Sequence, residues 1–410
     1  MEAPETHSFS IRFVLLGILL QLTSPATAQS IDLSDWQSLE RQARGETVYF
    51  NAWGGEPRTN NYLAWVSELM LERYDITLQH VKISDTAEAV SKVVAQRQAG
   101  NDDNGSIDLL WINGENFAAL KENDLLYGPW AESLPNFKLV NADRFPEMLE
   151  DFTVPTQGFE SPWTRAQLVF YYDSQWLAEP PQDIRQILEW SISNPGEFTY
   201  PRPPAFLGST LLKQALIELS DRDPALYAPV SSAEFERLAQ VLWEYLDALH
   251  PSLLRSGRYF PASAIDLRRL MGDGEISLAF AFNPNEALLS VRSGELPPSV
   301  RSYVLRNGTI SNVSFLAIPY NASQKAGAMV TANFLLSIEA QARASDPDHM
   351  GSTPAISISD LDSNARRSFE TITRDLAAPS AEDLDRKLQE PHPSWTPALE
   401  RAWIRRYSAR

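Results

Sequence analysis

Hydrophobic and polar positions change period in a regular order along the first third of the chain. Residues 47–53 form an apolar and aromatic run typical of a strand, and residues 60–73 carry apolar side chains at helical spacing. Residues 76–83 alternate as a strand does, and residues 87–99 return to a helical pattern that ends at Gly100. The strand-like sequence IDLLWING and the helical sequence ENFAALKENDLL follow. This order predicts an α/β fold with a mostly parallel sheet flanked by helices.

The pattern breaks over residues 151–167, which contain two prolines and a glycine. A second α/β unit is then predicted over roughly residues 168–305, beginning with the strand LVFYYDS and including a long helix over residues 233–249. The strand NVSFLAIP and the helix AGAMVTANFLLSIEAQARA resemble pieces of the first unit, and a helix near residues 397–407 ends the chain. We therefore expect two units, with the chain returning to the first one.

The N-terminus has the features of a secretion signal. An apolar run over residues 13–22 follows Arg12 and precedes the small residues Ala26 and Ala28. The run is too short to cross a hydrocarbon layer of about 30 Å. We therefore predict a signal peptide over residues 1–28 and a linker over residues 29–45, with no direct membrane insertion of the mature chain.

Charge and cysteine content exclude several classes of function. The 410 residues contain 53 acidic and 35 basic side chains, a net charge of −18, which disfavours nucleic acid and anionic membrane surfaces as partners. The absence of cysteine excludes disulfides, thiolate metal sites and cysteine nucleophiles. The five histidines show no ligand spacing. We therefore predict no metal site and no cofactor.

Candidate binding residues follow the predicted strands, because ligands of open α/β sheets bind beyond the carboxyl ends of the strands. Strand after strand ends in an aromatic or small residue followed by Gly, Asn or Ser at a helix start. Glycine allows close approach of the backbone, a helix start offers free N–H groups, and an indole offers a stacking wall. The predicted binding residues are Trp53, Gly54, Gly55, Glu56, Trp111, Asn113, Gly114, Glu115, Asn116, Trp163, Thr164, Gly208, Ser209, Thr210, Phe282, Asn283, Asn285 and Asn312.

Each of these signals also has a structural explanation. A single tryptophan is more often a core residue, a Gly-Gly pair is a turn, and a Gly-Ser-Thr run is a helix cap. The recurrence of the same arrangement after four or five strands favours a site that holds a small polar molecule. The rival class is a secreted hydrolase that uses paired carboxylates such as Glu56 and Glu115, although the chain lacks a GxSxG nucleophile motif and a metal motif.

Several segments resemble a known family. The stretches GSIDLLWINGENFAALKENDLL, AQLVFYYDSQWL, GDGEISLAFAFNPNEA and NVSFLAIPYNASQKAGAMVTANFLLS resemble the type II periplasmic solute-binding proteins of ABC importers. More narrowly, YFNAWGG and LLWINGENF resemble the YnjB group of ABC-transporter binding proteins. The resemblance extends from about residue 47 to residue 410.

The resemblance implies two lobes that are joined by crossing hinge strands and close over a ligand. Lobe one would comprise residues 46–165 plus 310–348, and lobe two residues 166–309 plus 349–410. Trp53, Gly54 and Gly55 would form one wall of the cleft. The chain would be a monomer in the periplasm of a Gram-negative type of cell. It would deliver a small-molecule solute to the permease and ATPase subunits of an ABC importer.

The ligand class stays open at this point. An organic cation such as thiamine or a polyamine would suit the tryptophans and Glu56 and Glu115. A sugar would suit tryptophan stacking with asparagine side chains, and an anion would suit the helix starts at Ser209 and Asn285. Ferric iron is a further alternative, because iron-binding relatives use a tyrosine pair, but Tyr171 and Tyr172 are adjacent in a predicted strand and should point to opposite faces.

Overall fold

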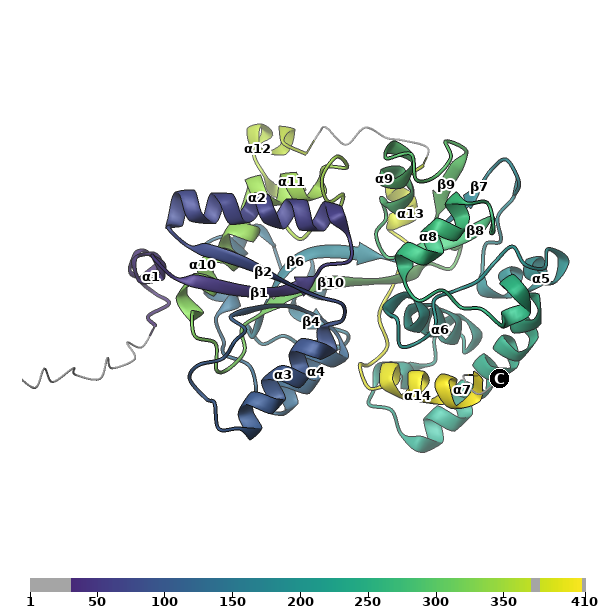
Figure 1. Cartoon of the computed structure of the whole chain (residues 1–410), viewed down its shortest axis with the longest axis horizontal. Helices are drawn as coiled ribbons and strands as arrows, with labels where there is room; N and C mark the ends of the chain where they lie inside the picture. The colour runs from purple at the N-terminus through teal and green to yellow at the C-terminus, as the bar shows by residue number, and fades with distance from the viewer. Residues whose placement is uncertain (1–30, 370–376, 408–410) are drawn as a thin grey trace, which may run out of the picture.

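The structure is a computed structural model that describes residues 31–369 and 377–407. Two lobes lie side by side in it (Figure 1). The predicted signal peptide, residues 1–28, lies outside the described residues. No helix among the described residues combines the length and the apolar character that crossing a membrane requires.

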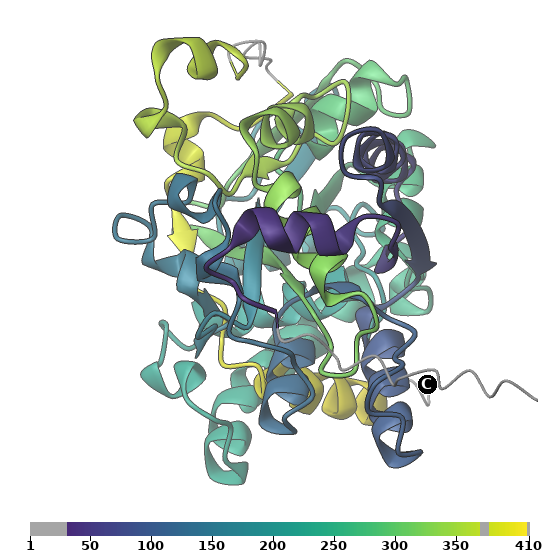
Figure 2. The ribbon, with the colours of Figure 1, turned by 90° about the vertical axis from the view of Figure 1, so that its left-hand side faces the viewer.

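Lobe one contains the larger sheet, whose strand order is β11-β6-β10-β3-β1-β2, with β12 paired to β10. Its strands are β1 (Thr47–Trp53), β2 (Thr77–Ile83), β3 (Leu109–Ile112), β6 (Glu160–Gln167), β10 (Thr309–Ala317), β11 (Thr353–Pro354) and β12 (Lys387–Leu388). Its helices are α1 (Trp36–Ala43), α2 (Pro57–Tyr74), α3 (Thr86–Gln98), α4 (Glu115–Glu122), α10 (Lys325–Leu335), α11 (Ile338–Ser345) and α12 (Ser363–Arg367). In the view of Figure 1, α2 lies above the sheet and α3 and α4 lie below it. Figure 2 shows the outer end of this lobe, where α1 packs across α10.

Lobe two contains a three-stranded sheet of order β8-β7-β9. The strands are β7 (Val169–Asp173), β8 (Leu278–Ala281) and β9 (Val300–Tyr303). The surrounding helices are α5 (Ile184–Ser193), α6 (Phe206–Leu219), α7 (Ser232–Leu249), α8 (Ala264–Gly272), α9 (Glu286–Arg292), α13 (Ala381–Leu384) and α14 (Trp395–Tyr407). A separate two-stranded sheet, β4 (Glu150–Asp151) and β5 (Val154–Pro155), precedes β6.

Strand direction follows from the way the chain crosses between the lobes. The strand β6 leads directly into β7, and β10 begins beside this crossing, where the Leu168 N–H donates to the Ile310 carbonyl at 2.8 Å. The two strands that enter a lobe from the crossing, β7 and β10, pair antiparallel with their neighbours β8, β9 and β3, whereas β1 pairs in parallel with β2 and β3. The second sheet thus differs from a parallel arrangement because β7 separates β8 from β9. The carboxyl ends of β1, β3 and β8 therefore face the junction between the lobes.

Two hydrophobic cores correspond to the two lobes. The first runs from Leu39 to Trp163 and resumes at Val313, and the second runs from Leu168 to Ile310 and resumes at Leu388. The first core also contains Met350, Ala355, Ile356, Leu361 and Phe369. This stretch differs from our expectation that residues from 349 onward belong to lobe two, because β11 adds to the edge of the first sheet through pairing with β6.

Candidate functional site

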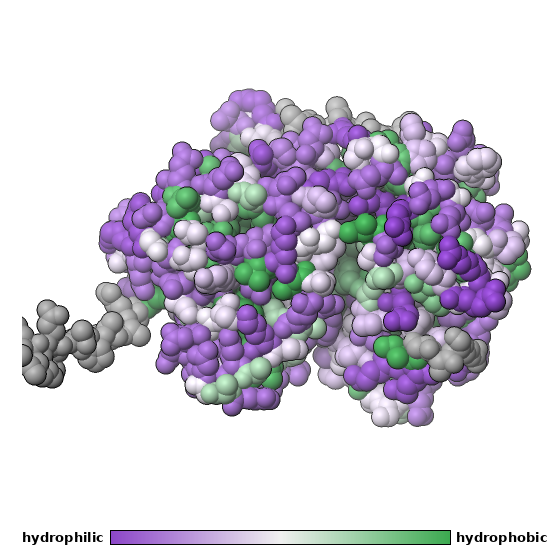
Figure 3. All heavy atoms as spheres, in the orientation of Figure 1, coloured by the Kyte–Doolittle hydropathy of each residue, from purple (hydrophilic) through white to green (hydrophobic). Residues whose placement is uncertain are grey.

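A groove runs between the lobes on the face shown in Figure 3, and hydrophobic side chains lie in its recessed part. Contacts between the lobes bring predicted site residues together along this junction. The charged side chains at this junction form two groups. One contains Glu56 and the other contains Glu115.

The first charged group is an ion-pair network between the lobes, which we call the interlobe clasp: Glu56, Arg58, Arg268, Glu286 and Glu295. Arg268 of α8 lies 3.2 Å from Glu56 and 2.9 Å from Glu295, and it also pairs with Glu286. Glu56 caps the start of α2 and contacts Arg58 at 3.2 Å. Burial raises the pKa of Glu56, but the charges of Arg58 and Arg268 outweigh burial and hold it below its ordinary value. Glu56 is thus engaged by arginines, which weakens its predicted role as a ligand-binding or catalytic carboxylate.

The double glycine after β1 is required by local packing. A Cβ atom on Gly55 would lie 2.4 Å from the indole of Trp53, and one on Gly54 would lie 2.5 Å from Cβ of Lys82. The chain therefore folds back over the half-buried indole before α2 begins, which only glycine permits here. This packing places the loop that carries Glu56 against lobe two.

The two other predicted tryptophans differ in exposure. Trp163 is 0 % exposed and packs edge-to-face against Trp111 with ring centroids 4.9 Å apart, so it is a core residue and not part of a solute surface. Thr164 is also buried, because β6 lies between β10 and β11. Trp111 is half-buried. The predictions for Trp163 and Thr164 thus do not fit their burial in this structure.

The second charged group begins at the start of α4. Gly114 has a φ of +61°, and a Cβ atom there would lie 2.7 Å from the ring of Phe152, so the position requires glycine. Its N–H donates to Asp151 Oδ2 at 2.7 Å. This turn directs Glu115 into the junction, where burial raises its pKa to about 7 despite the opposing charge of Lys213. The half-buried side chains of Asn113 and Asn116 flank this glutamate in the sequence.

Lobe two and the C-terminal segment supply the facing residues. Ser209 of α6 donates from Oγ to Glu400 of α14 at 2.6 Å. Lys213 of α6 pairs with Glu390 at 2.7 Å, and both side chains are 2 % exposed. Asn312 of β10 donates to the other oxygen of Glu390 at 3.1 Å. Ser209 is thus bonded to the C-terminal helix, whereas Asn312 and Lys213 share Glu390.

The acidic side chains of this junction influence one another, and we call Glu115, Asp151, Glu390 and Glu400 the acidic cluster. Burial raises the pKa of each of them, and the charges of Glu390 and Glu400 add to the shift at Glu115. Asp151 is raised further by Glu115 and Glu390. Lys213 opposes the rise at all four positions. Glu390 thus contacts the buried lysine directly, and the charge of Lys213 lowers the pKa of the other three carboxyl groups.

Gly208, Thr210 and Phe282 serve the packing of lobe two itself. Gly208 lets α6 approach the preceding loop, because a Cβ atom would lie 2.1 Å from the Pro201 carbonyl oxygen. Thr210 is buried and bonds back to the Phe206 carbonyl at 2.8 Å. Phe282 packs edge-to-face against Phe206, which is 44 % exposed, at a centroid distance of 5.1 Å. Phe206 and Phe282 thus form an aromatic pair that is partly open to solvent.

Two predicted asparagines hold a loop instead of facing a solute. Asn283 donates to the Met350 carbonyl at 3.4 Å, and Asn285 donates to the Gly351 carbonyl at 2.8 Å. Both therefore connect the carboxyl end of β8 to the segment that follows α11. Their amide groups are engaged in this conformation, which does not fit the predicted binding role.

The tyrosine pair that iron binding would need, Tyr171 and Tyr172, lies within β7, and its two side chains have different surroundings. Tyr171 is buried in the second core, whereas Tyr172 packs edge-to-face against Tyr303 with ring centroids 5.7 Å apart. Within residues 31–369 and 377–407, no three histidine or acidic side chains are grouped so that they could hold a metal ion.

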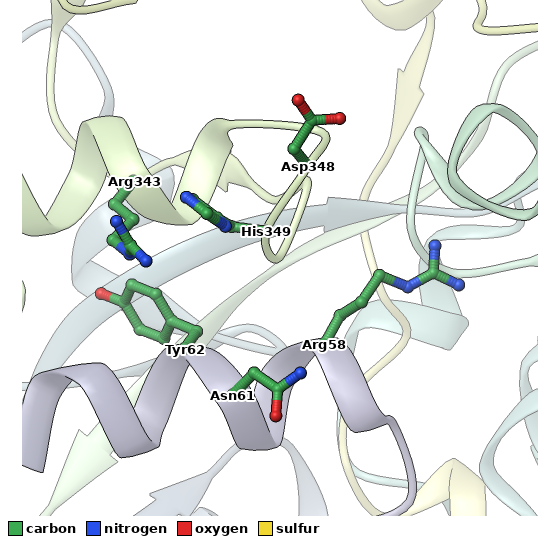
Figure 4. A pocket seen from close by; sticks show the side chains of 6 residues that line it. All are labelled: Arg58, Asn61, Tyr62, Arg343, Asp348 and His349. Atoms are coloured by element: carbon green, nitrogen blue, oxygen red, sulfur yellow. The ribbon is translucent and has the colours of Figure 1, made fainter. Parts of the chain in front are cut away.

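A small cavity lies outside this junction, between α2 and α11. Figure 4 shows Tyr62, Arg343 and His349 facing it, while Arg58 extends away. Its volume is ≈ 80 Å³, below the roughly 300 Å³ at which sites for organic ligands begin. Tyr62 donates to the Ala340 carbonyl at 3.2 Å, and Arg343 lies over the ring of Trp65 at 4.6 Å. These residues connect the two helices.

Four residues of the second charged group were absent from the predicted site: Asp151, Lys213, Glu390 and Glu400. Lys213 carries one usable signal, since it is the single charged residue in the apolar run LLKQALI. Asp151 and Glu390 lie in segments without clear periodicity, and Glu400 lies in the predicted C-terminal helix, where an acidic residue is no local signal of a site.

The chain matches known proteins over most of its length. Residues 64–365 match the family model described as bacterial extracellular solute-binding protein. Protein YnjB of Escherichia coli (strain K12) is 44 % identical over 393 residues, which cover 96 % of this chain and 98 % of that protein.

Two solved structures share the fold. The spermidine/putrescine ABC transporter substrate-binding protein PotD from Streptococcus pneumoniae is 14 % identical, with a TM-score of 0.61 over 89 % of this chain and 99 % of that one. The periplasmic binding protein AfuA from Actinobacillus pleuropneumoniae is 15 % identical, with a TM-score of 0.60 and the same coverage. The two-lobed fold and the family match together show that this chain belongs to the bacterial extracellular solute-binding proteins of ABC transporters.

Proposed function

We propose that the chain captures a small polar organic solute in the groove between its lobes and delivers it to the permease and ATPase subunits of an ABC importer. The observation that carries this proposal is a contact across the junction: Nζ of Lys213 in lobe two lies 4.5 Å from the ring centroid of Phe152, the ring against which Gly114 of lobe one packs. Residues contributed by two lobes form a complete binding surface only when the lobes are close together. The site would thus assemble on closure.

The crossing strands suit a hinge. Gln214 of α6 accepts from the Ile310 N–H at 2.9 Å and donates to the Gly308 carbonyl at 3.2 Å, so α6 is anchored beside β10. A rotation about this region would move Ser209 and Lys213 relative to Glu115 while leaving the core of each lobe intact. The interlobe clasp supplies polar contacts that can form and break with this motion.

The proposal also fits the predicted signal peptide, which would carry the chain into the periplasm as a monomer. A binding role agrees better with the geometry than the paired-carboxylate hydrolase does. Glu56 is held by two arginines, and Glu115 belongs to the other charged group.

Distance measurements between spin labels test the proposal directly. The chain has no cysteine, so Lys92→Cys in α3 and Arg405→Cys in α14 would create unique labelling positions on exposed residues of the two lobes. The added probe would be the small molecules released by heating protein purified from the periplasm. We expect the distance between the labels to shorten or its distribution to narrow.

A matched control pair, Lys92→Cys with Glu68→Cys, places both labels on exposed positions of lobe one and should not respond. Native mass spectrometry of the unheated protein should show a non-covalent mass that disappears on unfolding. If no small molecule is retained and neither label pair responds, the capture of a solute between the lobes is refuted.

A further inference from the structure

The acidic cluster has an unequal balance of charge. It contains four carboxyl groups, and a single lysine, Lys213, lowers the pKa of every one of them. Lys213 is paired with Glu390 at 2.7 Å. Within the part of the chain that the structure describes, Glu115, Asp151 and Glu400 have no ion-pair partner within 4.0 Å. The junction therefore holds more carboxyl groups than cations paired with them.

Buried oxygen atoms give an independent indication. Asp151 is 1 % exposed, and its Oδ1 atom has no hydrogen-bond partner among the described residues, although Oδ2 accepts from the Gly114 N–H. Glu160 is equally buried, and neither of its carboxyl oxygens has a partner in the same part of the chain. The Gly114 N–H donates to Oδ2 of Asp151 at 2.7 Å, so the Asp151 carboxyl group lies beside the start of α4, next to Glu115. Buried acceptors are normally satisfied, which indicates that a donor is absent here.

Lys213 shows how the junction accommodates a charged nitrogen. Its Nζ atom contacts Glu390 and lies over the ring of Phe152, 4.5 Å from the ring centroid. Carboxylate contact on one side and an aromatic face on the other is the environment that organic ammonium groups prefer. Further aromatic surface is available from the half-buried Trp111 and the partly exposed Phe206.

We infer that the solute is an organic cation, whose positively charged nitrogen binds between Glu115 and Asp151 of lobe one and Glu400 of lobe two. This inference rests on the proposed function. Among the described residues of the two charged groups, every cation is already paired, because Lys213 is engaged by Glu390 and the arginines of the clasp are engaged by glutamates. A neutral sugar would leave the carboxylates uncompensated. The carbon skeleton would lie against the aromatic residues.

Pairs of compounds that share shape and differ in charge test this inference. The probes are choline against 3,3-dimethylbutan-1-ol, putrescine against 1,4-butanediol, thiamine, glucose, succinate and calcium chloride. Binding is measured at pH 8 by calorimetry and by the rise in unfolding midpoint, which reports ligands that prefer the native state. We expect binding by one or more of the organic cations and no binding by their neutral counterparts.

The variants Glu115→Gln and Glu400→Gln should each weaken the binding of that cation by about tenfold to a hundredfold, the usual effect of losing a charged hydrogen-bond partner. Glu122→Gln, at the exposed opposite end of α4, changes net charge equally and should leave the affinity unchanged. Glu115 and Glu400 lie in different lobes, so a folding defect in one lobe would not explain weaker binding by both variants.

The alternative outcomes separate the inference from the proposed function. If glucose, succinate or a neutral counterpart binds and the interlobe labels respond, the inference that the solute is an organic cation is wrong. The proposal that a solute is captured between the lobes then still stands. Binding of calcium alone would overturn the organic character of the cation. Cation binding that survives both glutamine substitutions would overturn the assignment to the acidic cluster. Failure of every probe, together with no retained solute, would count against both proposals.

Discussion

Glu115 is expected to destabilise the empty protein at neutral and higher pH. Burial raises its pKa from 4.5 to about 7. At about 1.4 kcal/mol for each tenfold change in proton affinity, ionising this group in the folded protein costs about 3 kcal/mol more than in the unfolded chain. Because the side chain is half-buried, solvent screens part of this cost, and we expect about 2 kcal/mol. The substitution Glu115→Gln removes the ionisation and keeps the shape of the side chain.

The pH dependence has a definite sign. The folded protein binds the Glu115 proton more tightly than the unfolded chain does, so the stability from this proton is complete below about pH 4.5 and is lost as the pH rises to about 7. Glu115→Gln should therefore match the parent at pH 4.5 and exceed its free energy of unfolding by about 2 kcal/mol at pH 8. The same variant should bind the cation less tightly.

Urea unfolding followed by the fluorescence of the 11 tryptophans measures this difference at the two pH values. Glu68→Gln, at an exposed position of α2, serves as the control and should not change the stability with pH. A stability difference between parent and Glu115→Gln that is equal at pH 4.5 and pH 8 would refute the reasoning. A greater affinity of the variant for the cation would refute the functional assignment.

Four further substitutions probe the junction and the core. Lys213→Met should destabilise the protein by about 3–5 kcal/mol in urea unfolding, because it leaves Glu390 buried without a counter-charge. Adding Glu390→Gln should restore most of the lost stability. An equal loss in the single and the double variant would contradict this. Arg268→Gln should open the interlobe clasp and increase the radius of gyration in small-angle scattering, and unchanged scattering would show that the clasp does not hold the lobes. Trp163→Ala should cost about 3–5 kcal/mol of stability as a core truncation, and a variant with parental stability but lost solute binding would reverse this assignment.

The elements of lobe one could be predicted closely, because the spacing of hydrophobic residues in the sequence matches the spacing of buried positions in each strand or helix. The predicted strand over residues 47–53 coincides with β1, and the predicted helix over residues 60–73 lies within α2. The helix α2 begins three residues earlier because Glu56 caps it and Pro57 occupies its first turn, a signal independent of periodicity. The direction of strand pairing could not be predicted in the same way, since the side chains of β7 and β8 alternate between faces whether the strands pair parallel or antiparallel.

The predicted site residues fall into two classes that local sequence cannot separate. Gly114 and Ser209 each donate to a carboxyl group of the acidic cluster, because a strand end and a helix start bring them there. Asn285 has the same local pattern, but its amide is used by a loop carbonyl 66 residues further along the chain. Trp163 lies within the break in the pattern and is buried by the sheet around it. Only tertiary contacts decide between a residue that binds a solute and one that holds a loop.

The two charged groups of the junction have opposite consequences for closure. In the interlobe clasp, arginines and glutamates of different lobes attract one another, so approach of the lobes is favoured with or without a solute. In the acidic cluster, the same approach brings Glu115 close to Glu400, and like charges oppose it. A bound cation would reverse the sign of this second contribution because it contacts carboxylates of both lobes only in the closed state. A ligand shifts a conformational equilibrium by its differential affinity for the two states, and the distribution of carboxylates over both lobes supplies that difference.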